Sequence, residues 1–155
     1  MTRKTKSKQQ ETYQSYIFQL VDWQPFYSLS ISPRKDDDDP YWEYASVDIS
    51  TSSIFPERFA GTTAHMRFVG DRSFLNPKIL EHNKHWKPLC IGELKVRSEG
   101  AEFYAAVPFD SLFGIVSILM TERCHFVVLY GPQIRYGKSK CLSFDITATV
   151  DLEEY

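Results

Sequence analysis

The chain has 155 residues, of which 43% are hydrophobic and 15% aromatic, so it has the size of one domain and enough apolar material for a core. Its 18 basic and 20 acidic residues give a net charge of −2, which excludes a whole-protein field that attracts nucleic acid or another acidic surface. The 3 cysteines are an odd number and form no Cys-x-x-Cys pair, so we predict no disulfide framework and a reducing compartment.

The first fourteen residues differ in composition from the rest of the chain. Residues 1–10 carry four basic residues and no acid, and the segment has no apolar face, so we predict that residues 1–14 form a disordered basic tail. Residues 15–155 then form a single β-rich domain. The tail lacks the apolar stretch of a secretory signal, and no later run has the length of a membrane span. We therefore expect a cytoplasmic protein with no membrane partner.

Alternation of apolar and polar residues predicts that most of the following segments are β-strands covered on one face. The first segment is the exception, because large residues occupy both of its faces, as in a strand covered on both sides. We expect Pro25 to end that strand. The predicted strands lie at 16–23, 27–31, 44–49, 64–68, 92–97, 103–107, 125–130 and 141–150. The second and third form a hairpin with a long charged tip, and the fifth and sixth form another.

Two segments favour a helix. Apolar residues recur at helical spacing within 110–122, which predicts the main helix, although β-branched residues and Gly114 leave a strand as the alternative. Asn76 and Pro77 combine an N-cap residue with proline at the first helical position, which predicts a short helix at 77–85. Seven or eight mostly one-sided strands with these helices predict a mainly β fold, either an antiparallel β-sandwich or a curled sheet.

Two groups of residues carry the chemistry of metal ligands. The four acids of Asp36–Asp39 resemble a calcium loop, but Tyr41 stands where an EF-hand needs glycine and Val47 where it needs glutamate, so we predict a solvated tip. The second group consists of two histidines three residues apart and a nearby cysteine, a spacing that zinc ligands use, but it lacks a clear fourth ligand. We therefore predict no metal and no other cofactor. The candidate metal ligands are His82, His85 and Cys90.

Catalytic motifs are absent from the sequence. Cys124 and His125 are neighbours, but adjacent residues of a strand point to opposite faces and cannot bond to each other. Asp22 is the one acid inside a strand that is apolar on both faces, and a buried carboxylate there would need a partner. Asp22 is therefore the only candidate for a catalytic acid, and the sequence does not favour an enzyme.

Aromatic residues supply the best indication of function. Trp42, Tyr44 and Tyr104 lie on strand faces opposite the predicted core, and Trp23 lies on the strand covered on both sides. A cluster of exposed aromatic rings is typical of a contact surface or a ligand cleft. The alternative is that a second layer, such as the main helix, covers these rings.

We therefore expect a non-enzymatic binding or self-assembly module that binds another protein or its own copy through an aromatic sheet face. The strand at 141–150 could pair with its own copy if it lies at a sheet edge. One alternative is a small hydrolase or ligand-binding barrel, with Asp22 or a histidine acting on a small molecule in an aromatic cleft. The other is a weak single-stranded nucleic-acid binder. Glu93, Glu99 and Glu102 disfavour it, because they share a hairpin with the basic Lys95 and Arg97.

Overall fold

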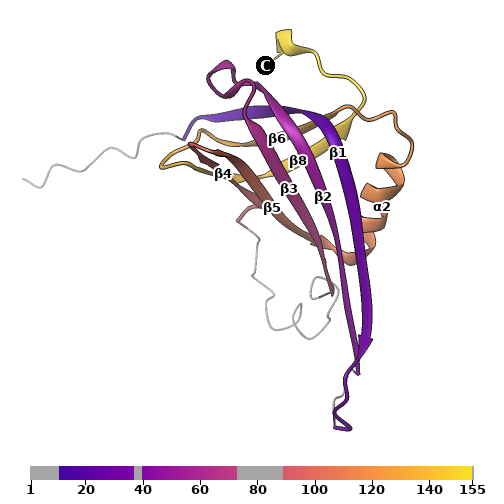
Figure 1. The fold of residues 1–155 in the computed structure, drawn as a ribbon. Helices are drawn as coiled ribbons and strands as arrows, with labels where there is room; N and C mark the ends of the chain where they lie inside the picture. The colour runs from indigo at the N-terminus through magenta and orange to yellow at the C-terminus, as the bar shows by residue number, and fades with distance from the viewer. Residues whose placement is uncertain (1–10, 37–39, 73–88, 155) are drawn as a thin grey trace, which may run out of the picture.

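The computed structural model describes residues 11–36, 40–72 and 89–154. These residues form one mixed sheet of eight strands, curled almost into a barrel, and an α-helix packed at its open side (Figure 1). The strands are β1 (Tyr13–Ile31), β2 (Tyr41–Phe55), β3 (Thr63–Asp71), β4 (Gly92–Arg97), β5 (Gly100–Pro108), β6 (Phe126–Pro132), β7 (Lys138–Cys141) and β8 (Ser143–Thr147). The α-helix is α2 (Phe109–Leu119), and the short 3-10 helices are η1 (Glu57–Phe59) and η3 (Leu152–Glu154).

The strand order is β7-β4-β5-β3-β2-β1-β6-β8. The pairs are antiparallel apart from β3 with β5, which are parallel. The two ends of this order are joined by one short segment, because β7 pairs with β4 while β8, directly after it, pairs with β6. The Leu142 amide donates to the Tyr130 carbonyl at 2.7 Å where the chain crosses between the two edges. The curled sheet is therefore confirmed. The eight strands belong to one sheet and do not form the two separate sheets of a sandwich.

The core lies inside the curl of the sheet. Phe68 on β3 contacts Phe103 on β5, with ring centroids 5.7 Å apart, and Phe144 on β8 at 4.8 Å, so aromatic packing links distant strands of the order. The helix adds its buried face to the same core, and Gly114 lies on its exposed face. The predicted main helix is thus confirmed, and the strand alternative for this segment is wrong. The helical residues in the core are Phe109, Leu112, Ile115 and Leu119.

Two strand predictions were wrong. Pro25 does not end a strand: β1 continues through it, paired with Val47, because no strand lies beside β1 there to need a proline N–H. The regular alternation from 141 to 150 is not one strand either. Leu142 is exposed between β7 and β8, so the chain changes sheet edge inside the pattern. The predicted helix at 77–85 and residues 1–10 of the predicted tail lie outside the described residues.

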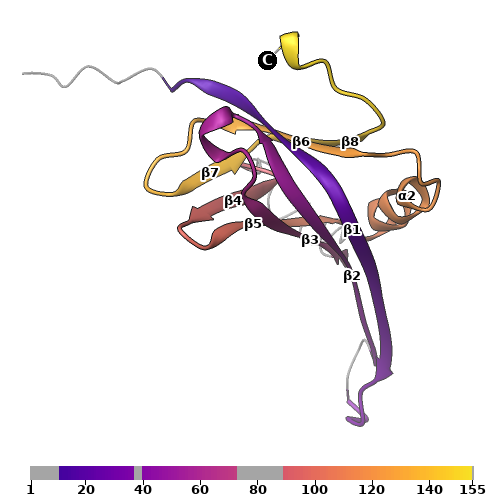
Figure 2. The same cartoon turned by 45° about the horizontal axis from the view of Figure 1, so that its top comes forward.

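The β1–β2 hairpin extends well beyond the barrel (Figure 2). β6 pairs with β1 only as far as Gln19, and β3 pairs with β2 only from Ser46 onward. Within the described part of the chain, residues 27–31 and 41–45 therefore pair only with each other. We call this two-stranded projection the arm.

Candidate functional site

Both faces of the arm expose large apolar side chains. Ala45, Val47 and Ile49 of β2 point into the core, so the residues opposite or in line with them share that inner face. Ile31, 69% exposed, lies on the inner face and Trp42, 67% exposed, lies on the outer one. The exposed apolar residues of the arm are Tyr27, Leu29, Ile31 and Tyr41 on the inner face and Trp42 and Tyr44 on the outer face.

Polar contacts fix the base of the arm to the barrel. The Tyr27 hydroxyl donates to Glu43 Oε1 at 2.9 Å, and Glu43 forms an ion pair with Arg72 just after β3. The Arg72 guanidinium lies 5.4 Å from the centre of the Phe109 ring at the start of α2. The Glu43 side chain is only 10% exposed while the Arg72 side chain is 55% exposed, so this ion pair is shielded from water on the carboxylate side. The arm therefore projects in a direction that the barrel and the helix set.

Three of the four aromatic residues predicted to bind lie exposed on the outer face of the sheet. Trp42 and Tyr44 are on the arm and Tyr104 is on the barrel, and the Arg67 guanidinium lies within electrostatic range of both tyrosines. Trp23 is half-buried and packs against the core. The helix does not cover Trp42, Tyr44 or Tyr104, because its buried side chains belong to the core on the other face of the sheet. The alternative of a covering helix is therefore wrong.

Sequence reasoning missed the inner face of the arm. It assigned Tyr27, Leu29 and Ile31 to a core because they alternate with serines, but in the structure they lie beyond the barrel and are exposed. The one signal available was the absence of charge from Phe26 to Ser32, next to a highly charged tip. Alternation of apolar and polar residues shows only that the two faces of a strand differ. It does not indicate what covers either face.

Asp22 is exposed and not buried, contrary to the expectation that made it a catalytic candidate. It lies where the register of β1 against β2 shifts, between Leu20 and Asp22. Its Oδ1 accepts a hydrogen bond from the Trp23 amide at 2.8 Å. A bulge turned the carboxylate to solvent, which the sequence pattern did not indicate.

Of the candidate metal ligands, the structure describes only Cys90. His82 and His85 lie outside the described residues, as do residues 37–39 of the acidic tip, and Cys90 is half-buried. Within the described ranges, no three His, Cys, Asp or Glu side chains gather closely enough to hold a metal ion. His125 is exposed and the Cys124 thiol lies 4.0 Å from the Ile146 carbonyl oxygen.

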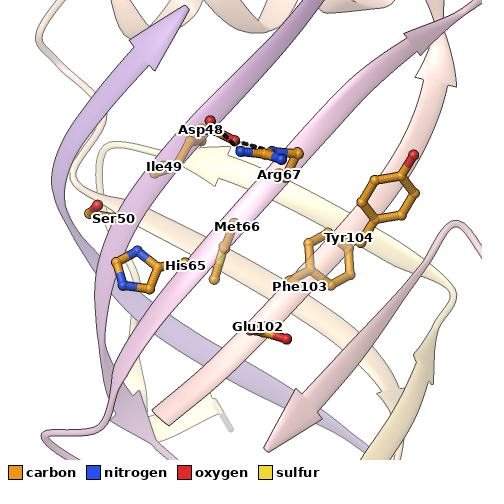
Figure 3. A pocket seen from close by; sticks show the side chains of 9 residues that line it. All are labelled: Asp48, Ile49, Ser50, His65, Met66, Arg67, Glu102, Phe103 and Tyr104. Carbon is orange, nitrogen blue, oxygen red and sulfur yellow. Dashed lines mark hydrogen bonds and ion pairs between the residues drawn. The ribbon is translucent and has the colours of Figure 1, made fainter.

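A groove of about 440 Å³ crosses the outer face of β2, β3 and β5 (Figure 3). In one row across these strands Ser50, His65 and Glu102 stand opposite one another. In the next row Asp48, Arg67 and Tyr104 do the same. Asp48 accepts two hydrogen bonds from Arg67, at 2.6 and 2.9 Å, and these raise the pKa of the Arg67 guanidinium.

The row of Ser50, His65 and Glu102 has the residue types of a catalytic triad but not its connections. Nucleophilic catalysis requires a serine bonded to a base that an acid orients. The Glu102 carboxylate is turned away from the His65 ring (Figure 3) and lies 3.9 Å from Arg97 instead. Among the residues described, no hydrogen bond joins Ser50 to His65. These three side chains therefore do not form a hydrogen-bonded triad in the groove, which apolar residues such as Met66 and Phe103 also line.

Basic side chains on the outside of the barrel are interleaved with acids. Glu93 lies 3.4 Å from Lys95 and 4.0 Å from Lys138, so one carboxylate serves two ammonium groups of neighbouring strands. Arg67 pairs with Asp48 in the same way. On the strands that the structure describes, acids therefore interrupt the positive charge, whereas single-stranded nucleic acid is bound by a continuous positive groove.

Comparison with known proteins adds no likeness to these observations: no family model, curated protein or solved structure matches the chain. Among the described residues, none of the helices combines the length and hydropathy that crossing a membrane would take.

Proposed function

We propose that the protein is a non-enzymatic binding or assembly module whose contact surface is the arm. The observation that carries this proposal is the exposure of six large apolar side chains on a hairpin held away from the barrel. A two-stranded hairpin is only marginally stable in water by itself. Exposed apolar surface of this extent is typical of an interaction site on a soluble protein.

The gain from covering the arm is large enough for specific binding. Six half-exposed side chains offer roughly 100 Å² each, or roughly 600 Å², which is worth about 15 kcal/mol before the costs of association are subtracted. Those costs are of order 4–15 kcal/mol, so a partner that covers both faces would bind with moderate affinity. The contacts of Glu43 with Tyr27 and Arg72 reduce the cost, because they orient the arm before the partner arrives.

Removing the arm should abolish association and leave the barrel folded. The Ser32 amide donates to the Pro40 carbonyl at 2.6 Å, so Phe26 and Ser46, in the same register, form a closely hydrogen-bonded pair. An Asn-Gly turn in place of residues 27–45 can join that pair. In a native extract of the cells that make the protein, the full chain should elute above its monomer mass of 18.0 kDa and the shortened chain at its own monomer mass.

The matched control for this experiment is Tyr136→Ala, which removes a fully exposed aromatic ring far along the chain from the arm. Its elution should equal that of the full chain. Equal elution of the full and shortened chains, with both folded by circular dichroism, would contradict the arm as the contact surface.

A further inference from the structure

Along the arm, the outer edge of β1 has no neighbouring strand among the residues that the structure describes. The last bond on that side runs from the Leu20 amide to the His125 carbonyl, at 2.8 Å. The bond between Ser32 and Pro40 sets the alternation, so Ser28 and Ser30 bond to β2. The odd-numbered residues of this stretch therefore turn their backbone groups outward. They are Trp23, Pro25, Tyr27, Leu29 and Ile31.

This edge is blocked near the barrel and open on the arm. The Trp23 amide is occupied by the Asp22 carboxylate at 2.8 Å, and Pro25 has no N–H to donate. Tyr27, Leu29 and Ile31 follow with outward N–H and C=O groups, and no strand of the described residues lies beside them. Proline and charged side chains on an edge strand protect it from pairing with another chain. Their restriction to residues 22–25 leaves one five-residue stretch available to another strand.

We infer that a second copy of the chain pairs with this open edge, antiparallel and centred on Leu29, to make a two-fold dimer. The inference rests on the proposed function of the arm and names its partner. Antiparallel pairing about Leu29 places Tyr27 opposite Ile31 of the partner subunit, so each copy offers the surface that the other needs. The stretch from Tyr27 to Ile31 carries no charge, so two copies meet no like-charge repulsion along it.

The direction of this pairing brings the tip of each arm toward the partner's helix. α2 lies on the same side of the molecule as the free edge of β1 in both views (Figures 1 and 2). Its solvent face exposes Phe113, Ile118 and, just after the helix, Met120. An antiparallel neighbour running up the edge of β1 approaches this apolar surface with the end of its own inner face, where Ile31 and Tyr41 lie.

The area available predicts a reversible dimer. Four inner-face side chains and Phe113, each roughly half exposed, offer at most roughly 450 Å² per copy and at most roughly 900 Å² in total. Specific interfaces begin near about 1,000 Å², so we expect a dimer whose population depends on protein concentration.

Sedimentation equilibrium of the purified full chain tests the inference. An interface of this size is expected to have a dissociation constant between about 1 µM and about 1 mM. Over that range of protein concentration, the average mass should rise from 18.0 kDa toward twice that value. Leu29→Ala keeps the outward N–H and should weaken the dimer roughly tenfold. Leu29→Pro removes the N–H, which the monomer does not use, and should remain a monomer throughout with unchanged circular dichroism.

Each other result has a definite meaning. A monomeric wild-type chain at all concentrations overturns the second copy as partner. Equal dimerisation of Leu29→Pro and Leu29→Ala overturns strand pairing. If the purified chain is a monomer but the arm still controls its size in native extract, the proposed function stands and only the identity of the partner is wrong. If the arm has no effect in either setting, both are wrong.

Discussion

Replacing Phe68 with alanine should lower the free energy of unfolding by about 3–5 kcal/mol. The Phe68 side chain is fully buried, and its ring contacts Phe103 and Phe144. These contacts connect β3 to β5 at its side and to β8 at the end of the strand order, so the ring fills the centre of the curl. Alanine would leave a cavity that strands on several sides would have to collapse to fill.

The matched control is Phe26→Ala at the base of the arm. Phe26 is 54% exposed and contacts Tyr44 edge-on at 5.8 Å. Its loss should cost less than about 1 kcal/mol, as for an exposed side chain. Urea unfolding followed by circular dichroism measures both variants. Similar losses for Phe26→Ala and Phe68→Ala would mean that the core is not centred on Phe68.

The second large effect is a loss of stability at high pH that depends on Cys141. Burial raises the pKa of the Cys141 thiol from 9.0 to about 12. Its folded-state pKa is above its unfolded value, so below about pH 9 the thiol is protonated in both states and stability is independent of its titration. Above about pH 9 only the unfolded state loses the proton, and stability should fall by about 1.4 kcal/mol per pH unit up to about pH 12.

Cys141→Ala isolates this contribution, because other groups titrate equally in both proteins. The free energies of unfolding of the wild type and the variant should run parallel up to about pH 9, and above it the wild type should lose stability more steeply. Parallel curves at all pH values would show that the Cys141 thiol is not buried as the structure has it.

The sequence predicted those strands that have one buried face and one exposed face. Ala64, Met66 and Phe68 alternate with exposed residues, and that pattern is enough to place a strand and its inner face. The helix was also predictable, because apolar residues recur at helical spacing within 110–122. Its buried face was predictable only in part: Leu112 and Leu119 are buried as expected, but Phe113 and Met120 of the expected face are exposed. Alternation of apolar and polar residues does not indicate which strands pair with each other. The parallel pairing of β3 with β5 and the crossing at Leu142 depend on contacts between distant segments.

The candidate site was predictable only in part, for the same reason. Trp42 and Tyr44 were identified because they lie on the polar face of a strand, but Tyr27, Leu29 and Ile31 have the pattern of core residues. Their exposure follows from where β6 and β3 stop pairing with the hairpin, at Gln19 and Ser46. No local pattern marks the point at which a neighbouring strand ends. Asp22 was misjudged because a bulge, invisible in the sequence, redirected it.

Hydroxyl-radical footprinting tests most directly whether the arm is the contact surface. Oxidation of individual side chains is compared between the purified chain at low concentration and the same chain in native extract. Trp42 and Tyr27 should be oxidised several-fold less in the extract, where a partner covers the arm, while the fully exposed Tyr136 should be oxidised equally in both. Equal oxidation of Trp42 and Tyr27 under the two conditions would contradict the arm as a contact surface.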